Sequence, residues 1–278
     1  MSQYAFLNNE FLPEEKAMIH VRDLSVQRGY GIFDFFKVIA GKPLYLENHL
    51  DRFYSSAEKM YLQVSYSREE LEKIIGELLE KNDSEHCGIR ITLTGGYSSD
   101  GYSISHPLLI ITLHNFSSPS QAQYHQGISL ACYEHQRQLP EIKTIDYLMA
   151  IWLQPWLKKM QADDVLYHHQ GWISECPRSN FFLITEENKL VTPAKNILKG
   201  ITRMKILEAA RSIFEVEERP VHLHELTTAK EAFISSSTKK ILPVSRIDSK
   251  AFPVPGARAI ILTDLLSQNQ TGTSLLLK

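Results

Sequence analysis

The chain has 278 residues, of which 43% are hydrophobic and 22% are charged, a composition typical of a globular protein large enough for two domains. Its net charge of -2 provides no basic field for a nucleic-acid backbone, so we expect no nucleic-acid partner. The three cysteines fit neither a metal site nor a disulfide framework, and no apolar run reaches the roughly 18 residues of a membrane helix. The first residues lack the pattern of a signal peptide, and we therefore expect a cytoplasmic protein.

The first part of the chain predicts a small α+β domain over residues 1–116. Asn8 and Asn9, between apolar pairs, predict a tight hairpin. Residues 33–39 are rich in strand-forming side chains, and a turn at 40–42 predicts a return strand after it.

Two helices and two further strands complete this domain. The apolar spacing predicts a helix from Glu47 with one buried stripe, made by Leu50, Phe53, Ala57 and Met60. The pair Ser67 and Glu70 is a capping box, which predicts a second helix with buried Leu71, Ile74, Ile75 and Leu78. Strands are predicted at 88–94 and 108–114.

Residues 117–122 have the composition of a loop, and we interpret them as the linker to a larger, β-rich domain over residues 123–278. This second part predicts strands at 127–133, 164–169, 180–185 and 231–235, and helices at 147–160, 201–214 and 257–267. The overall prediction is a two-domain α+β and α/β protein.

Lys143 stands among apolar neighbours, with Ile142 before it and Ile145 after it. A lysine ammonium is strongly hydrated, so a lysine in such a segment either extends to solvent or is buried as a neutral amine. The neutral amine is the form that attacks an aldehyde carbonyl, which makes Lys143 the candidate nucleophile.

Schiff-base chemistry with pyridoxal phosphate also requires a carboxylate for the pyridine nitrogen and a cradle for the phosphate. Glu175 follows Gly171 between two predicted strands, where a carboxylate can point into a cleft. Gly200 begins a predicted helix whose first N–H groups, with the hydroxyl of Thr202, suit a phosphate. Residues 235–238 form a second turn of this type after a predicted strand.

These motifs resemble those of the class IV, or fold-type IV, pyridoxal-phosphate aminotransferases. That family includes D-amino acid, branched-chain and (R)-amine transaminases and 4-amino-4-deoxychorismate lyase. The resemblance covers nearly the whole chain in the family's order, through residues 28–38, 48–53, 55–59, the Lys143 segment, 171–182, 190–193, 198–203 and 235–244. It implies a small α+β domain, a larger β-rich domain, a cofactor in the cleft between them, and a homodimer that completes the site.

The resemblance also implies a role for each matching residue. Lys143 would bind the cofactor as a Schiff base and shuttle the substrate proton, and Glu175 would keep the pyridine nitrogen protonated. Tyr147 would hydrogen-bond the cofactor phenolate, although the spacing from lysine to tyrosine is one residue shorter than in branched-chain members. The phosphate would be held by Arg52, the amides of Ile201 and Thr202, and the turn of Ser237 and Thr238.

A transaminase must also bind the α-carboxylate of its substrate. Typical D-amino acid members use an Arg-x-His motif after a strand, whereas residues 93–102 of this chain contain neither residue. Strand alternation places Arg90 on a polar face, and Arg28 precedes the strand of Phe33 that should line the cleft. We expect Arg90 and Arg28, the latter from its own or a partner subunit, to bind the carboxylate beside Phe33. Arg178 is a third candidate, and the alternative is that both arginines form structural ion pairs.

The second phosphate turn, Ser-Ser-Ser-Thr at residues 235–238, is closer to the D-amino acid branch than to the Gly-Thr-Ala of branched-chain enzymes. We therefore expect transamination between D-alanine or D-glutamate and 2-oxoglutarate or pyruvate. Branched-chain L-amino acid transamination, the lyase reaction and non-catalytic binding of pyridoxal phosphate are the alternatives. His222 and His224 lack a third ligand at a recognisable spacing, so we expect no metal site.

Overall fold

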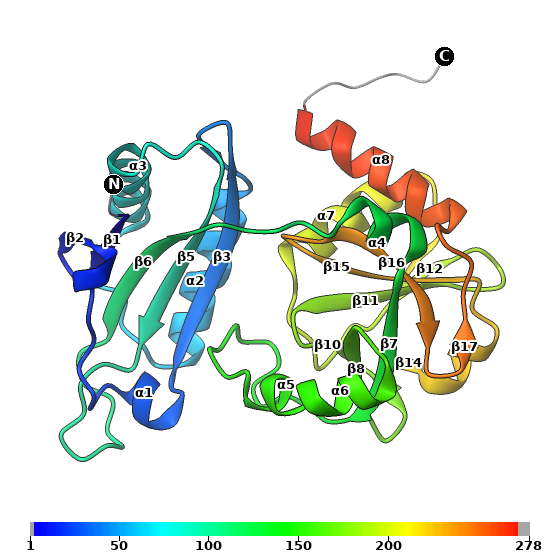
Figure 1. The fold of residues 1–278 in the computed structure, drawn as a ribbon, viewed down its shortest axis with the longest axis horizontal. Coiled ribbons are helices and arrows are strands. Elements are labelled where there is room, and N and C mark those ends of the chain that lie inside the picture. Colours follow the sequence, from blue (N-terminus) through cyan, green and yellow to red (C-terminus); the bar gives the residue numbers. More distant parts are fainter. Residues whose placement is uncertain (1–2, 272–278) are drawn as a thin grey trace. The chain divides into compact units, whose positions relative to one another are not determined.

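A computed structural model describes residues 3–271 and divides the chain into two compact units (Figure 1). The first unit comprises Met1–Ser117 with Ile142–Asp146, and the second comprises Ser118–Glu141 with Tyr147–Lys278.

This division differs in two places from the predicted boundaries of 1–116, 117–122 and 123–278. The predicted linker overlaps a helix, because Ser120 caps α4 (Gln121–Gln126) through a capping box with Gln123. The segment Ile142–Asp146, predicted to belong to the second domain, lies in the first unit because its backbone pairs with a strand there.

Six antiparallel strands form the sheet of the first unit, in the order β2-β1-β6-β5-β3-β4. The strands are β1 (Tyr4–Leu7), β2 (Glu10–Pro13), β3 (Gly31–Ile39), β4 (Lys42–Pro43), β5 (Cys87–Thr94) and β6 (Leu108–His114). The helices are η1 (Glu14–Lys16), α1 (Leu24–Arg28), α2 (Leu46–Lys59) and α3 (Arg68–Lys81). The predicted hairpin at Asn8 and both predicted long helices are confirmed.

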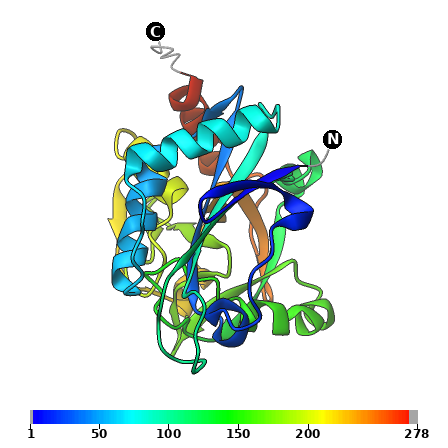
Figure 2. The same ribbon diagram turned by 90° about the vertical axis from the view of Figure 1, so that its left-hand side faces the viewer.

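Helices α2 and α3 cover one face of this sheet, and the core of the unit lies beneath them (Figure 2). The predicted stripe is confirmed, since Leu50, Phe53 and Ala57 of α2 are buried. The capping box of Ser67 and Glu70 is present at the start of α3. Of the side chains predicted to be buried on α3, only Ile74 remains partly exposed.

The alternation predicted for β5 is also confirmed. Ile89, Ile91 and Leu93 join the core beneath the helices, whereas Arg90 and Thr92 project from the opposite face. Across the ladder, Phe33 pairs with Thr92 and Phe35 pairs with Arg90. The first unit therefore carries an aromatic and cationic face opposite its helices.

The second unit is built on an eleven-stranded sheet whose main path is β13-β12-β11-β15-β16-β7-β8-β9-β14. Its strands are β7 (Ile128–Glu134), β8 (Asp164–His169), β9 (Trp172–Ile173), β10 (Glu175–Cys176), β11 (Ser179–Ile184), β12 (Leu190–Thr192), β13 (Val216–Glu218), β14 (Val221–His222), β15 (Glu231–Ser236), β16 (Lys240–Ile247) and β17 (Lys250–Ala251). Its other helices are α5 (Leu148–Trp152), α6 (Gln154–Met160), α7 (Ile201–Ala210), η2 (Leu223–Thr227) and α8 (Ala257–Thr271).

Alternate residues of the central strands enter two cores on opposite faces of this sheet. Phe182 and Phe233 pack with α7 and α8 on one face, while Phe181 and Ile234 join the core of the other. Asn180 on β11 lies directly opposite Ser235 on β15. Because their side chains share the face of Phe182, both point toward the side of the sheet that α7 covers.

Two predicted helices of this unit are shorter than expected. The helix predicted at 147–160 is broken at Leu153 into α5 and α6. Pro155, in the first turn of α6, has no N–H group that could donate a helical hydrogen bond to the carbonyl of Ile151. Helix α7 ends at Ala210 instead of Phe214, and the hydroxyl of Ser212 donates to the carbonyl of Ala209 just beyond its end.

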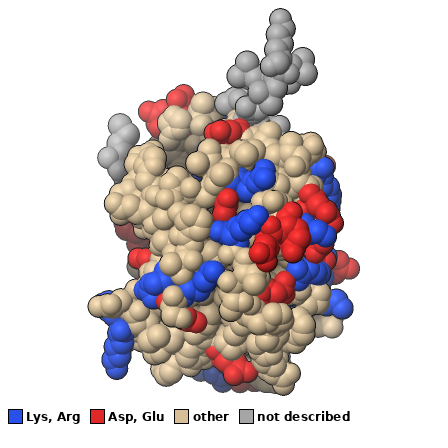
Figure 3. Space-filling view, turned by 90° about the vertical axis from the view of Figure 1, so that its right-hand side faces the viewer, with Lys and Arg blue, Asp and Glu red and all other residues tan. Residues whose placement is uncertain are grey.

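Acidic and basic side chains are interspersed on the face of the molecule in Figure 3. In the second unit, Lys189 pairs with Glu215 and Glu217, and Arg219 pairs with Glu217 and Glu225. Such alternation of sign provides no large basic patch on the face shown. Within residues 3–271, no helix has both the length and the apolar character needed to cross a membrane.

Candidate active site

Lys143 lies in the first unit, on a short extended segment beside β3. The N–H of Phe33 donates to the carbonyl of Lys143 at 3.0 Å, and the N–H of Ile145 donates to the carbonyl of Gly31 at 3.1 Å. Ile142 and Thr144 are buried, so strand alternation turns Lys143 to the other face of the segment. Its Nζ lies 4.5 Å from the centroid of the Phe33 ring.

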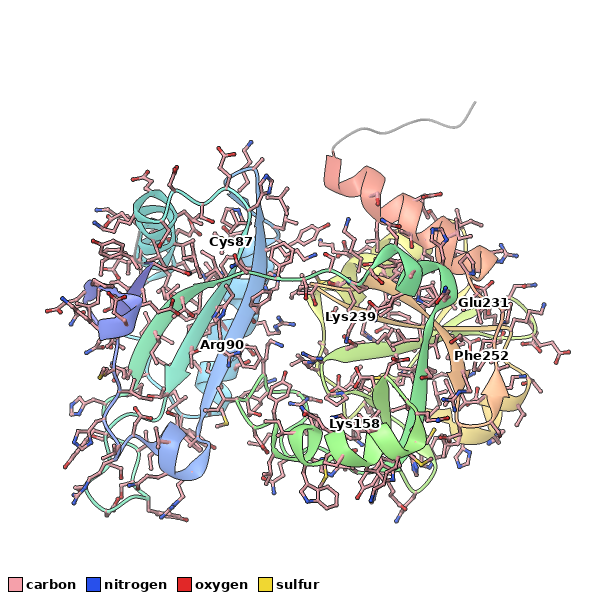
Figure 4. All side chains as sticks on the ribbon, viewed as in Figure 1. Cys87, Arg90, Lys158, Glu231, Lys239 and Phe252 are labelled. Carbon is pink, nitrogen blue, oxygen red and sulfur yellow. The ribbon has the colours of Figure 1, made fainter. Side chains whose placement is uncertain are left out.

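Arg90 contacts the same ring. The Cζ atom of Arg90, which projects from β5 (Figure 4), lies 3.9 Å from the Phe33 centroid, and its Nε donates to Thr92 Oγ1 at 3.2 Å. Both cations are thus within cation–π distance of one ring. We call Phe33, Arg90 and Lys143 the Phe33 cluster, and it unites three residues that the sequence predicted for the site.

Arg52 belongs to a buried group on the helix side of the sheet. Its Nε and Nη2 each donate at 2.8 Å to Asp34, and His49 Nδ1 lies 2.7 Å from Asp34 Oδ1. Asp34 is fully buried, and burial alone would raise the pKa of its carboxyl. The charge of Arg52 and the hydrogen bonds from His49 and Arg52 outweigh burial, so the pKa of Asp34 lies well below its usual value. We call Asp34, His49 and Arg52 the buried triad.

Arg28 and Arg178 have exposed side chains. Arg28 ends α1, and its Nη1 donates to the carbonyl of Gln27 at 2.9 Å. Arg178 lies in the turn between β10 and β11. Neither is part of the Phe33 cluster, unlike Arg90. Tyr147 is the N-cap residue of α5 in the second unit.

Glu175, the predicted partner of a pyridine nitrogen, is buried in the second unit with three hydrogen-bond donors around it. Arg137 Nη1 donates to Oε1 at 2.8 Å, while Asn180 Nδ2 and the N–H of Leu198 each donate to Oε2 at 3.1 Å. Three donors, one of which is the cation Arg137, satisfy an ionised carboxylate, so Glu175 can stay charged where water is scarce. No motif in the sequence singles out Arg137, although a buried glutamate requires a counter-ion.

Asn180 links the two predicted phosphate turns, because it lies beside Gly200 and directly opposite Ser235. Gly200 is the N-cap of α7 and offers no capping side chain to the first N–H groups, which include those of Ile201 and Thr202. A Cβ atom on Gly200 would lie 2.1 Å from Asn180 Oδ1, so only glycine permits this approach.

The second turn begins with a buried hydroxyl, that of Ser235. Ser235 is 1% exposed, and its Oγ has no hydrogen-bond partner within the described residues. It lies opposite Asn180, whose Nδ2 also donates to the carbonyl of Leu198 just before α7. Ser236 Oγ accepts from the N–H of Lys239 and closes the turn that holds Ser237 and Thr238. We call this region, residues 200–202 with 235–238, the anion cradle.

The two histidines considered as metal ligands lie in β14 and η2 rather than in one strand. Their Nδ1 atoms are 2.7 Å apart, which fits a hydrogen bond between the rings of His222 and His224. Among residues 3–271, no three His, Cys, Asp or Glu side chains are grouped so that they could hold a metal ion.

A sequence model of the class IV amino-transferase family matches residues 31–247. D-alanine aminotransferase of Staphylococcus epidermidis is 29% identical over 255 residues, which cover 88% of this chain and 89% of that protein. A putative branched-chain-amino-acid aminotransferase of Methanocaldococcus jannaschii is 28% identical over 263 residues, covering 88% of each chain.

Solved structures have the same fold. The branched-chain aminotransferase of the thermophilic archaeon Thermoproteus uzoniensis, in a crystal structure with norvaline, superposes with a TM-score of 0.88 at 23% identity. The match covers 99% of this chain and 97% of that one. The predicted fold type is therefore confirmed.

Proposed function

The chain belongs to the class IV aminotransferases, whose cofactor is pyridoxal phosphate, and from that premise we propose that it transfers the amino group of D-amino acids. In this proposal D-alanine and D-glutamate are donors, and 2-oxoglutarate and pyruvate are acceptors, in two alternating half-reactions. The Phe33 cluster carries the proposal, because it joins a donor for a substrate carboxylate to an amine. The Ser-Ser-Ser-Thr turn and the relatives named D-alanine aminotransferase support the choice of D-amino acids.

The residues present suit the cofactor. The anion cradle offers helix N–H groups and the buried hydroxyl of Ser235, which has no partner within the described residues, for a phosphate ester. Glu175 is ready to accept a hydrogen bond from a protonated ring nitrogen, since its charge is already compensated by Arg137. When bound, pyridoxal phosphate supplies an aldehyde that condenses with amines and a ring that withdraws electrons.

We propose for the other residues the roles that the family resemblance implies. Lys143 Nζ would anchor the cofactor, and as a neutral amine it would move a proton to and from the substrate α-carbon. Arg52, the N–H groups of Ile201 and Thr202, and the turn of Ser237 and Thr238 hold the phosphate. Tyr147 donates to the phenolate oxygen of the cofactor.

Arg90 is our candidate for the substrate carboxylate. Its Nε donates to Thr92 and its Cζ lies 3.9 Å from the centroid of the Phe33 ring, and the two Nη groups of a guanidinium form a fork that suits a carboxylate. Arg28, from the same or a partner subunit, is the second candidate, and Arg178 is the third.

We also propose that the enzyme is a cytoplasmic homodimer. Leu148, Ile151 and Trp152 on α5 are 76%, 62% and 63% exposed, and such a group of apolar side chains is typical of an interface. All three cysteines are free, which agrees with a reducing compartment. Sedimentation of the purified protein tests the dimer.

Two measurements test the proposed function. Borohydride reduction followed by peptide mass analysis should find a pyridoxyl group on Lys143, and its absence there would refute the cofactor assignment. Visible absorption should then change with D-alanine or D-glutamate. A response only to branched-chain L-amino acids would favour the activity named for the M. jannaschii relative.

Further outcomes identify the remaining alternatives. Release of p-aminobenzoate from 4-amino-4-deoxychorismate would show the lyase reaction, and a labelled Lys143 that responds to no amine would show a non-catalytic protein. Arg90→Met should raise KM for the amino acid about tenfold or more, whereas Arg178→Met should not if Arg90 is the carboxylate ligand.

A further inference from the structure

The buried triad connects the middle of β3 to two successive turns of α2. Asp34 projects toward the helices, and His49 and Arg52 are three residues apart on α2, so both reach the same carboxylate. Asp34 and His49 are 0% and 2% exposed, and the side chain of Arg52 is 13% exposed. Three polar side chains therefore occupy a place that apolar side chains fill elsewhere in this core.

Asp34 contacts one of the two hydrogen-bonding edges of the Arg52 guanidinium. Asp34 takes the side-on fork, with Nε on Oδ2 and Nη2 on Oδ1, both at 2.8 Å. The second fork of a guanidinium, between Nη1 and Nη2, then faces away from Asp34 along the direction of the side chain. A planar fork of this kind matches two oxygens of a phosphate.

His49 acts on the carboxylate, not on the guanidinium. Its Nδ1 is 2.7 Å from Asp34 Oδ1 but 3.4 Å from Arg52 Nη2, so the Nδ1 proton is donated to Asp34. Burial, the largest influence, lowers the pKa of His49, and the charges of Arg52 and Lys143 lower it further against the opposing effect of Asp34. A neutral His49 thus fixes the plane of the carboxylate without adding positive charge.

A buried ionic group of this kind is costly to desolvate and is often no more stable than an apolar replacement. Its retention in the core points to a purpose other than stability. Arg52 is the residue to which the proposed function assigns the cofactor phosphate, and the triad is what restricts its rotation.

We propose that Asp34 and His49 are positioning residues that hold the Arg52 guanidinium as a preformed anion-binding fork, and so make the protein select the phosphorylated cofactor. This inference rests on the proposed function. Without His49, the carboxylate of Asp34 can rotate and its side-on pairing with Arg52 weakens. Phosphate binding must then also order the Arg52 side chain, which lowers the affinity for phosphate.

The test compares binding of pyridoxal phosphate with binding of pyridoxal, which lacks the phosphate, to the apoprotein of each variant. In His49→Asn the amide nitrogen takes the position of Nδ1, whereas in His49→Gln it takes the position of Nε2. We expect His49→Gln to lose about tenfold in affinity for pyridoxal phosphate with an unchanged affinity for pyridoxal. His49→Asn should stay within about threefold of the wild type for both ligands.

A matched control lies on the same helix, since Ser56 is buried on α2 and is not part of the triad. Ser56→Ala should keep the wild-type ratio of the two affinities. Equal losses for both ligands in His49→Gln, or no loss for either, would overturn the inference, because a merely structural role would not distinguish the phosphate.

Inorganic phosphate separates this inference from the proposed function. If Lys143 carries no pyridoxyl group after borohydride reduction, the proposed cofactor role fails, and titration calorimetry with phosphate alone still tests the triad. Weaker phosphate binding in His49→Gln than in His49→Asn would support the fork, and equal binding in the two variants would reject it.

Discussion

Arg137 donates from Nη1 to Oε1 of Glu175 at 2.8 Å, and both side chains lie inside the second unit. The two residues are 38 positions apart in the chain, and Asn180 and Leu198 also donate to the carboxylate. In the proposed function, this carboxylate stays ionised beside Arg137 and accepts a hydrogen bond from the protonated ring nitrogen.

Glu175→Gln removes the negative charge at this position and keeps the size and shape of the side chain, so it tests the contribution of the charge. The amide leaves Arg137 without its buried counter-charge, so the free energy of unfolding should fall by about 3 kcal/mol. Amino-group transfer should fall by about 100-fold because the ring nitrogen loses its anionic partner. Urea denaturation and single-turnover absorbance measure the two effects.

The double variant Glu175→Gln with Arg137→Met is the control for this experiment. Removal of both charges should recover most of the lost stability but none of the lost rate. Recovery of the rate would mean that Glu175 contributes only to folding.

Gly200→Ala should disturb the anion cradle. The added Cβ would stand 2.1 Å from Asn180 Oδ1, so Asn180 or the start of α7 must shift, at a cost of about 1–3 kcal/mol of stability. Affinity for inorganic phosphate, measured by calorimetry, should fall in the same variant.

Gly76→Ala is the matched substitution in α3. No atom lies within 4 Å of a Cβ added there, so alanine should stabilise the helix by about 1 kcal/mol and leave phosphate binding unchanged. Equal destabilisation by both substitutions would show that the contact with Asn180 is not the cause.

Asp34→Asn should make stability less dependent on acid pH. A carboxyl whose pKa is lower in the folded state stabilises the fold above its unfolded pKa of about 3.9, and this contribution is lost as the pH falls through the folded pKa. The wild type should exceed the variant by about 3 kcal/mol at pH 7, and the difference should shrink below about pH 4.

Urea denaturation of the wild type and of Asp34→Asn at pH 7, 5 and 3.5 tests whether the difference in stability shrinks as the pH falls. Asp51→Asn, on the exposed side of α2, should change stability by less than about 1 kcal/mol at each pH. A difference between wild type and Asp34→Asn that grows with acidity would contradict the assignment of a charged Asp34.

The thiols of Cys132 and Cys176 should be slow to react in the folded protein. Burial raises the pKa of both, and at Cys132 the carboxylate of Asp248 raises it further, so almost no thiolate exists at pH 8. Iodoacetamide should modify them about 100-fold more slowly than in urea.

Asp248→Asn distinguishes charge from burial in this experiment. It removes the negative charge but keeps an oxygen for the N–H of Cys132, so Cys132 should react faster while Cys176 keeps its rate. Peptide mass analysis reads the two thiols separately, and a common acceleration would instead indicate unfolding.

The amino-acid sequence by itself determined the elements and most candidate residues. Strand periodicity placed Arg90 and Thr92 on one face of β5 and Ile89 and Ile91 on the other. The sequence suffices for this prediction because the alternation involves only neighbouring residues. The motifs around Lys143, Glu175 and Gly200 indicated the family for the same reason. Their assigned roles remain predictions.

Tertiary structure alone decided which residues meet. The return of Ile142–Asp146 to β3, the burial of Asp34 beneath His49 and Arg52, and the pairing of Arg137 with Glu175 all join segments distant in the chain. A local sequence pattern indicates whether a side chain is buried, but it does not identify the oppositely charged residue that pairs with it in the core. The order of the strands and the packing of the helices on them determine which residue becomes that partner. Because desolvation destabilises an isolated buried charge, the charge is stable only where the fold brings an opposite charge within hydrogen-bond distance.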